Sequence, residues 1–315
     1  MKKIVTIGEI LVEIMAVEPG DGFTQPLSLV GPFASGAPAI FIDQAAKFGQ
    51  PCGMVGCVGD DDFGRVNLDR LTRDGVEVSG IAVDPEFPTG SAFVRYRRDG
   101  SRAFVFNIKH SASGRAGLTQ SARALVESSD HLHVMGTSLF STTIVETILA
   151  AIGIIKANGG TISFDPNVRP EMLGLRGLRE ALESIFARCD LFLPSGQELY
   201  LFTKAMNEAG AIAEILGGGV KAVVVKNGDQ GATYHDRATH TRQSAFHVTE
   251  IDPTGAGDCF GATFVSCWLR GMPGSEALRY AAAAGARAVE RQGPMEGAST
   301  QAELDAFMVA REERP

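Results

Sequence analysis

Asp252-Pro253-Thr254-Gly255-Ala256-Gly257-Asp258 is the stretch of sequence that decides the fold. Residues 246–251 before it predict a strand, while Pro253 and the glycines predict a turn. The residues at 262–268 predict the body of a helix that begins at Gly255. The first N–H groups of a helix lack partners within it, and small residues permit close approach, so this junction predicts a pocket for an anion.

Asp258 places a carboxylate inside that pocket. It would repel a stably bound phosphate, but it is well placed to take a proton from an attacking hydroxyl while the N–H groups stabilise a transferring phosphoryl group. The alternative is an acidic residue that only interacts favourably with the helix dipole, and Gly-x-Gly-Asp alone does not decide between the two. A P-loop motif is missing, and Gly261 comes one position late for a dinucleotide-binding fingerprint.

The whole chain of 315 residues is 44% hydrophobic and 21% charged, which is typical of a globular α/β protein. Its formal charge of −8 argues against nucleic acid or an anionic membrane as a partner. No stretch reaches the roughly 18 apolar residues of a membrane span, and residues 4–8 predict a first strand rather than a leader, so we expect a cytoplasmic protein. Five cysteines without a C-x-x-C pair argue against a zinc site or a disulfide framework.

Short β-branched runs alternate with helical patterns along the chain, which indicates a mostly parallel sheet covered by helices. The clearest predicted strands are 4–7, 131–135, 161–165, 191–193 and 220–225. The clearest predicted helices are 36–48, 63–73, 142–157, 256–270 and 275–291.

Two regions interrupt this alternation, at residues 11–29 and 89–109. The second predicts a hairpin of 91–96 and 103–106 around the turn Arg98-Asp99-Gly100. We expect one domain over 1–315 with a small β lid formed by about 11–32 and 87–112, which covers an active site and excludes water. An antiparallel edge extension without a covering role explains the pattern equally well.

The segment 252–260 resembles the C-terminal signature of the ribokinase/PfkB carbohydrate kinase family. The likeness covers nearly the whole chain, and further motifs follow in the family's order at 4–9, 35–39, 58–64, 165–169 and 223–228. The resemblance implies a ribokinase-like three-layer sandwich with a β lid. It also implies Asp258 as general base and an anion hole for the γ-phosphate of ATP made by the amides of Gly255, Ala256 and Gly257.

The same resemblance implies a site for ATP and Mg²⁺. The residues around the nucleotide would be Ser195, Glu198, Lys226, Gly228, Gly231, Gly255, Gly257 and Gly293. The family's Asn-x-x-Glu motif corresponds to Ser195–Glu198, so the glutamate, which acts on magnesium through water, is kept and the asparagine is a serine. Taken alone, Lys226 is more typical of a strand-end surface lysine. A K⁺ site formed by carbonyl groups near Asp252 and Gly293 is left open.

The sugar side of the site departs from the family pattern. Ile40 stands where many relatives have an asparagine that contacts sugar hydroxyls, and Ile108 stands where 2-keto-3-deoxygluconate kinases have an arginine that binds the acid's carboxylate. By resemblance, the residues around the sugar would be Glu13, Gly36, Ala37, Asn107, Lys109, Asp165, Asn167, Arg169 and Asp258. Glu13 is equally explained as a solvated or lid residue.

The run at 35–40 resembles tagatose (ketohexose) kinases, and 165–169 resembles a motif of sugar kinases that include 2-keto-3-deoxygluconate kinases. Loss of the arginine at Ile108 favours a neutral ketohexose, tagatose or fructose, over the keto acid. Two other classes stay open: a non-catalytic regulator on the same fold that binds sugar or nucleotide, and a nicotinamide-linked sugar dehydrogenase, which the missing fingerprint disfavours. By analogy with relatives, we expect a homodimer that forms through the β lid.

Overall fold

Nine strands form the main sheet of the computed structural model, which describes residues 1–168, 174 and 177–312. The strand order is β13-β12-β11-β10-β9-β8-β1-β4-β5. The strands are β1 (Ile4–Ile7), β4 (Cys52–Gly59), β5 (Glu77–Asp84), β8 (His131–Met135), β9 (Thr161–Asp165), β10 (Leu191–Phe192), β11 (Ala222–Lys226), β12 (Ala232–Asp236) and β13 (His240–Gln243). Neighbouring strands are parallel except at one edge, where β11, β12 and β13 pair antiparallel.

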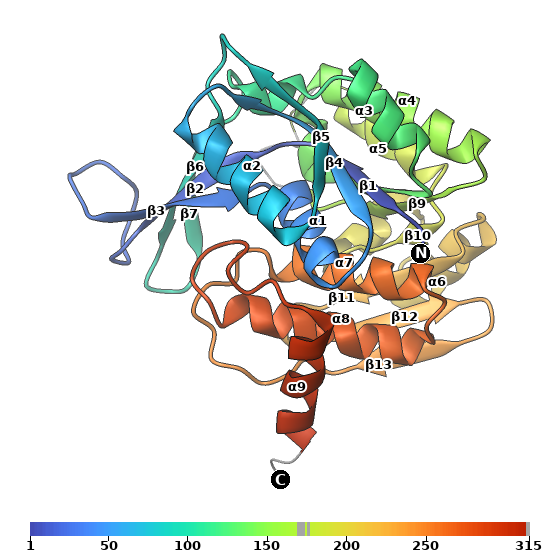
Figure 1. The fold of residues 1–315 in the computed structure, drawn as a ribbon. Helices are drawn as coiled ribbons and strands as arrows, with labels where there is room; N and C mark the ends of the chain where they lie inside the picture. The colour runs from blue at the N-terminus through green and yellow to red at the C-terminus, as the bar shows by residue number, and fades with distance from the viewer. Residues whose placement is uncertain (169–173, 175–176, 313–315) are drawn as a thin grey trace.

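Two apolar clusters separate the sheet from its helices (Figure 1). One cluster takes residues from α1 (Ala37–Lys47), α2 (Asp62–Asp74), α7 (Ala256–Leu269), α8 (Gly274–Val289) and α9 (Gln301–Glu312). The other takes residues from α3 (Gln120–Glu127), α4 (Thr142–Ala157), α5 (Leu178–Phe186) and α6 (Glu208–Gly217). The described part of the chain thus has three layers, and the predicted ribokinase-like α/β fold is confirmed.

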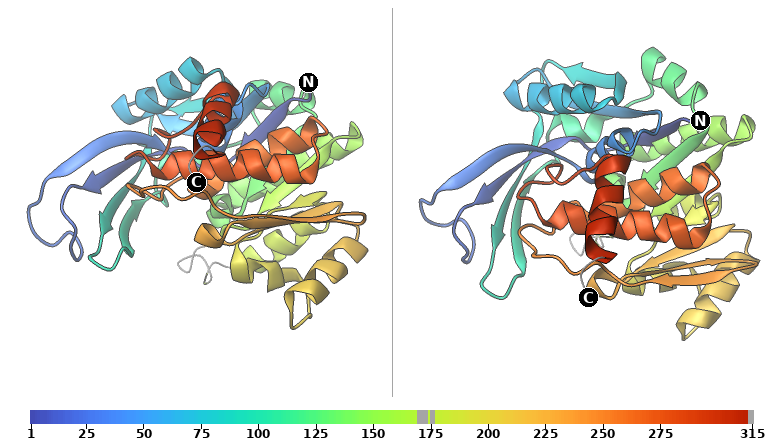
Figure 2. Two further views of the ribbon diagram at one scale, coloured as in Figure 1. Left: turned by 90° about the horizontal axis from the view of Figure 1, so that it is seen from below. Right: turned by 60° about the horizontal axis from the view of Figure 1, so that its bottom comes forward.

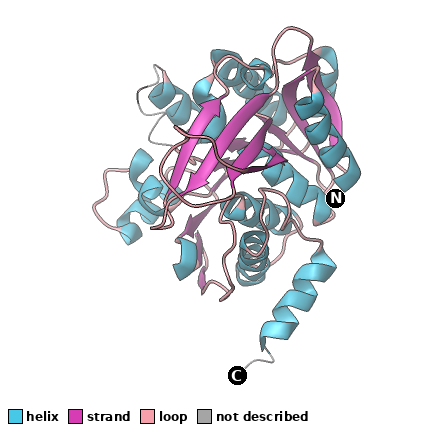
Figure 3. Cartoon of the chain, turned by 90° about the vertical axis from the view of Figure 1, so that its left-hand side faces the viewer, coloured by secondary structure: helices cyan, strands magenta, loops and turns pink. Residues whose placement is uncertain are grey.

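A second sheet of four strands projects from one side of the main body (Figures 1 and 2). Its order is β3-β2-β6-β7, with β2 (Leu11–Ala16), β3 (Leu29–Ser35), β6 (Gly90–Tyr96) and β7 (Arg102–Asn107). The central pair β2 and β6 is parallel, and the outer pairs are antiparallel. In Figure 3, in which this side faces the viewer, the lid strands lie in front of the helices.

One predicted strand is wrong. Residues 246–251 form neither a helix nor a strand, because β13 ends at Gln243 and the chain then leaves the edge of the sheet. Phe246 and Val248 of this segment pack on the core instead, with the ring of Phe246 against Phe307 of α9. The N–H of Ile251 donates to the carbonyl of Val289 at the end of α8, so the segment before the catalytic turn is held by a helix.

All five cysteines are free and buried. Among the described residues, no group of three or more His, Cys, Asp or Glu side chains is arranged to hold a metal ion. No helix of that part of the chain combines the length and apolarity that crossing a bilayer demands.

Candidate active site

The carboxyl ends of the parallel strands bring several motifs of the sequence to one edge of the main sheet. Asp165 ends β9 and Lys226 ends β11, while Gly136 follows β8 and Gly8 follows β1. Ligands of open α/β sheets bind beyond this edge, since loops there can converge without disturbing the core. The predicted nucleotide and sugar segments therefore meet at the usual binding edge of such a sheet.

The catalytic turn ends in α7, which begins at Ala256. Gly255 caps the helix with a φ of 82°, a left-handed conformation that favours glycine. A Cβ atom at Gly255 would lie 2.4 Å from the carbonyl oxygen of Pro294, so the turn is pressed against residues 293–294. Asp258 is buried in the first turn of α7, where helix geometry leaves N–H groups without intrahelical acceptors. A carboxylate and a set of outward N–H groups thus share one small site.

Asp252 connects the catalytic turn to two distant segments. Its Oδ1 accepts hydrogen bonds from the Thr254 N–H at 2.9 Å and from the hydroxyl of Tyr96 in the lid, and its Oδ2 accepts from the Gly293 N–H at 2.9 Å. Burial, and then the bond to Asp252, raises the pKa of Tyr96, which keeps its hydroxyl a donor. Because three donors already bind this carboxylate, a K⁺ ion here would rest on carbonyl groups rather than on the Asp252 side chain.

Asp165, Lys226 and Glu198 form a charged cluster at the ends of β9 and β11. The Lys226 ammonium contacts Asp165 Oδ2, while Asp165 Oδ1 is buried and has no hydrogen-bond partner among the described residues. Glu198 accepts from the N–H groups of Ser195 and Val168, each at 2.8 Å. Burial, and then the charge of Asp165, raises the pKa of Glu198.

This cluster fits a magnesium ion held partly by phosphate and water. Mg²⁺ prefers oxygen ligands and usually keeps several waters, so one or two carboxylates suffice. The unpartnered Oδ1 of Asp165 and the carboxylate of Glu198 are oxygens of that kind. A nearby cation would also relieve the repulsion between these two carboxylates.

The sequence profile of the pfkB family carbohydrate kinases matches residues 1–301. The chain belongs to this family. It is 30% identical to the 2-dehydro-3-deoxygluconokinase of Thermoproteus tenax, over 98% of this chain and 95% of that one. It is 28% identical to "Probable fructokinase-5" of Arabidopsis thaliana, over 98% of both chains. An Escherichia coli structure, provisionally named Ribokinase II and in complex with ATP and Mg²⁺, superposes with a TM-score of 0.94 at 47% identity, covering 98% of this chain and 100% of that one.

The prediction of a sugar kinase is therefore confirmed at the level of the pfkB family. Membership of the family does not test the roles of single residues, so the residues assigned to the nucleotide and the sugar stay predictions. The structure does show where each described one lies.

The predicted nucleotide residues lie along the edge from β11 to the catalytic turn. Lys226 is only 11% exposed and paired with Asp165, so the reading as a surface lysine is wrong. Gly228 and Gly231 flank a short 3-10 turn directly after β11. A Cβ atom at Gly231 would lie 2.0 Å from the carbonyl oxygen of Gln243, which explains the glycine by close backbone approach. Gly293 is tied to Asp252 as described above.

The predicted sugar residues of the first segments lie in the lid strand β2 and at the start of α1. Glu13 is buried in β2, so the reading as a solvated residue is wrong. Gly36 caps α1 with a φ of 113°, and a Cβ atom there would lie 2.4 Å from the Glu9 carbonyl oxygen. Ala37 begins α1, and Ile40 reaches the catalytic turn, since a Cβ atom at Gly255 would lie 3.1 Å from its Cγ2.

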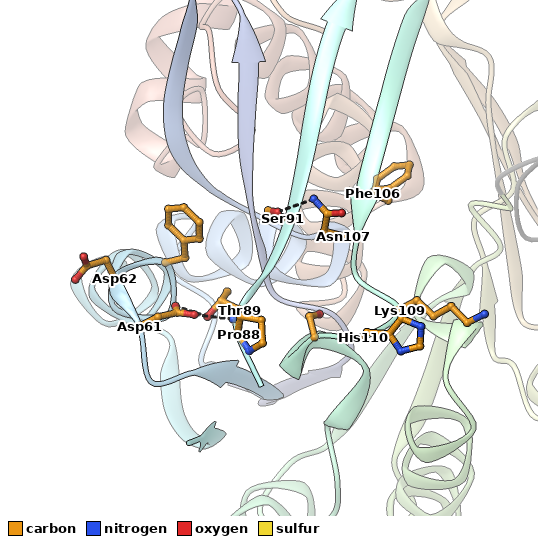
Figure 4. A pocket seen from close by; sticks show the side chains of 11 residues that line it. Asp61, Asp62, Pro88, Thr89, Ser91, Phe106, Asn107, Lys109 and His110 are labelled. Carbon is orange, nitrogen blue, oxygen red and sulfur yellow. Dashed lines mark hydrogen bonds between the residues drawn. The ribbon is translucent and has the colours of Figure 1, made fainter. Parts of the chain in front are cut away.

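Asn107 and Lys109 do not join this group. Asn107 pairs with Ser91, whereas Glu13 pairs with Ala92 one residue further along β6, so Asn107 and Glu13 point to opposite faces of the lid. Asn107 Nδ2 donates to Ser91 Oγ at 3.4 Å, and both line a cavity of about 630 Å³ with Lys109 and His110 (Figure 4). The register separates Asn107 from Glu13, and the assignment of Asn107 and Lys109 to the sugar stays a prediction.

Two predicted residues follow β9. Asn167 has a φ of 37°, and it is the one residue other than glycine with a positive φ in the described part of the chain, which indicates a constrained loop after Asp165. Arg169 lies outside the described residues.

Tyr96 and Arg102 contact the catalytic turn, and the sequence did not single them out. Both are lid residues far from 252–258 in the chain, and neither belongs to a motif. The alternation of side chains along β6 and β7 places both residues on one face of the lid, but it does not predict which segment that face contacts.

Gly255→Ala tests the packing of the catalytic turn. The new methyl group meets the Pro294 carbonyl and shifts the N–H groups, so we expect turnover to fall about 100-fold, the order that misplaced reacting groups cause. Steady-state phosphorylation and thermal unfolding are measured together. Gly271→Ala is the matched control, because Gly271 has a φ of 75° but open space around it. Equal turnover in the two variants would contradict the packing argument.

Proposed function

We propose that this pfkB family kinase transfers the γ-phosphate of ATP to a hydroxyl of a ketohexose, tagatose or fructose. The observation that carries the proposal is the buried Asp258 in the first turn of α7, three residues after Gly255, whose backbone packs closely against the Pro294 carbonyl. The start of α1 lies at the same turn, where Ile40 approaches Gly255, and Glu13 is a buried polar residue of the lid strand β2. The likeness to a fructokinase supports a ketose substrate.

In this mechanism Asp258 takes the proton of the attacking hydroxyl as that oxygen approaches the γ-phosphorus. The amides of Gly255, Ala256 and Gly257 stabilise the charge on the phosphoryl oxygens, and the dipole of α7 adds to their effect. Magnesium, when bound, neutralises charge on the phosphates, and Asp165 and Glu198 would hold it through water. Lys226, fixed by Asp165, keeps a positive charge at the same edge.

The keto acid 2-keto-3-deoxygluconate is the second candidate substrate, because a relative of that activity is 30% identical. Its carboxylate would need a cationic partner at the lid. Ile108 stands at the position expected for that partner, and Lys109 lines the cavity on the other side. These two observations favour the neutral sugar.

Asp258→Asn tests the chemistry. The amide keeps the shape of the side chain but cannot accept the proton, so we expect turnover to fall about 100- to 10,000-fold, the range of general base catalysis. ATP affinity, measured by calorimetry, is expected to stay near that of the wild type. Unchanged turnover in this variant would leave Asp258 without a catalytic role and favour a regulator that only binds sugar or nucleotide.

A panel of acceptors tests the substrate. ADP release with ATP-Mg²⁺ is measured for tagatose, fructose, ribose, 2-keto-3-deoxygluconate and a nucleoside. We expect the highest kcat/KM for one of the two ketohexoses, because Ile108 stands where the keto acid kinases have the arginine that binds the carboxylate. A preference for the keto acid would reverse the choice between the two candidates. Repeating the best reaction in K⁺, Na⁺ and tetramethylammonium decides the open K⁺ question.

We also propose a cytoplasmic homodimer formed through the lid. Five free cysteines are typical of proteins from reducing compartments. Leu29 and Val105, on β3 and β7, are 44% and 45% exposed and point to the outer face of the lid together with Phe93. Exposed apolar side chains of this kind, gathered on one sheet face, favour contact with a second copy.

Val105→Asp tests this interface. A charge on the apolar face opposes the burial of that face, so we expect a dimer in the wild type and a monomer in the variant, measured by light scattering coupled to gel filtration. Val309→Asp on α9 is the control, since Val309 is also exposed but lies away from the lid. A monomeric wild type, or a dimeric Val105→Asp protein, would contradict the proposed interface.

A further inference from the structure

Two lid side chains reach across to the catalytic turn from one face of the lid. Tyr96, the last residue of β6, pairs with Arg102, the first residue of β7, so their side chains lie on the same face. Glu13 lies on that face too, because it pairs with Ala92 and Ala92 is four residues before Tyr96. The face that carries a proposed sugar contact therefore also carries both of these residues.

The side-chain hydrogen bonds of these two residues connect them to the turn before α7. The Tyr96 hydroxyl donates to Asp252 Oδ1 and lies 3.3 Å from Thr254 Oγ1. Arg102 Nη1 donates to the same Thr254 Oγ1 at 3.2 Å, and its guanidinium lies 5.4 Å from the ring centre of Phe104. Asp252 is only 1% exposed, so the bond from Tyr96 to its charge is shielded from water.

The turn in question determines where the anion-hole amides point. Thr254 immediately precedes Gly255, and Asp252 also holds Gly293, whose neighbour Pro294 presses on Gly255. We expect a displacement of Asp252 or Thr254 to reach Gly255, because Gly255 directly follows Thr254 and its backbone lies close to the Pro294 carbonyl. The lid thus supports the phosphoryl site through a short and rigid path.

We propose that Tyr96 and Arg102 are positioning residues, through which the geometry of the anion hole depends on the position of the lid. Neither touches the reacting atoms. Tyr96 donates to Asp252 and Arg102 donates to Thr254. When the lid covers the sugar, these two bonds hold the turn in the position that stabilises the transferring phosphoryl group. This inference rests on the proposed phosphoryl transfer at Asp258 and adds a reason for the sugar to promote it: the sugar and the two donors share one sheet face.

Such a role affects the chemical step more than binding. Loss of the Tyr96 hydroxyl leaves Asp252 with backbone donors alone, while the contacts around the nucleotide and the sugar stay as they are. A misplaced anion hole raises the free energy of the transition state, in which charge develops on the phosphoryl group, but not that of the bound substrates. We therefore expect kcat to fall while the two KM values change little.

The test compares Tyr96→Phe, Arg102→Gln and the double variant. The lost bond of Tyr96 is to a charged group, so we expect kcat to fall about tenfold or more in Tyr96→Phe, with KM for ATP and sugar within about twofold. Arg102→Gln is expected to lose about threefold to tenfold. Both act on one turn, so the double variant loses less than the product of the single losses.

Tyr234→Phe is the matched control, because its hydroxyl also donates to an aspartate, Asp236 Oδ2 at 2.7 Å, on strand β12. We expect it to lower the melting temperature about as much as Tyr96→Phe while kcat stays at the wild-type value. A kcat for Tyr96→Phe within twofold of the control overturns the proposal, as do fully multiplicative losses. Arg102 is partly exposed, so Arg102→Gln alone decides the matter if Tyr96→Phe does not fold.

Asp258→Asn is assayed beside these variants to separate two failures. If Asp258→Asn keeps its turnover, the proposed chemistry is wrong. If it is inactive and Tyr96→Phe matches the control, only the positioning role is wrong. Rates are taken with the best acceptor of the sugar panel, or as basal ATP hydrolysis where no sugar of the panel is used.

Discussion

The buried carboxylate of Asp252 is the interaction on which the rest of the site depends. It accepts from Thr254, Gly293 and Tyr96, which come from the catalytic turn, the loop after α8 and the lid. A buried charge is costly unless donors surround it, so each of these segments is held where its donor meets the carboxylate. The Gly255 turn, the start of α7 and the position of Asp258 then follow from backbone geometry and close packing.

A second charged group, Asp165 with Lys226 and Glu198, is organised in the opposite way. Here one oxygen of Asp165 is left without a partner among the described residues, and two carboxylates lie close enough to affect one another. The first cluster is fully paired and rigid, whereas the second is poised to gain from a cation. This contrast separates the part of the site that holds its own shape from the part that a metal nucleotide would complete.

The catalytic turn could be predicted from the sequence because its signals are local. Glycine, proline and the helix after them specify a helix start within a few residues, and the order of the other motifs identified the family. Residues 246–251 were mistaken for a strand because apolar side chains pack on the core from a loop as well as from a strand. The face of Asn107 could not be predicted either, since a shift of one residue in register reverses it. The bond from Tyr96 to Asp252 spans 156 residues, and no local rule connects the two.

The β6–β7 hairpin turn has a consequence for how the lid can vary in length. Residues 97–101 join Tyr96 to Arg102, and the turn at its tip is exposed to solvent. Side chains alternate between the two faces of a strand, so one inserted residue that slid β7 along β6 would turn the guanidinium of Arg102 away from Thr254. An insertion of two residues would restore its direction. A register shift of this hairpin by an odd number of residues would therefore break the contact between Arg102 and the catalytic turn, although the hairpin turn itself is exposed to solvent.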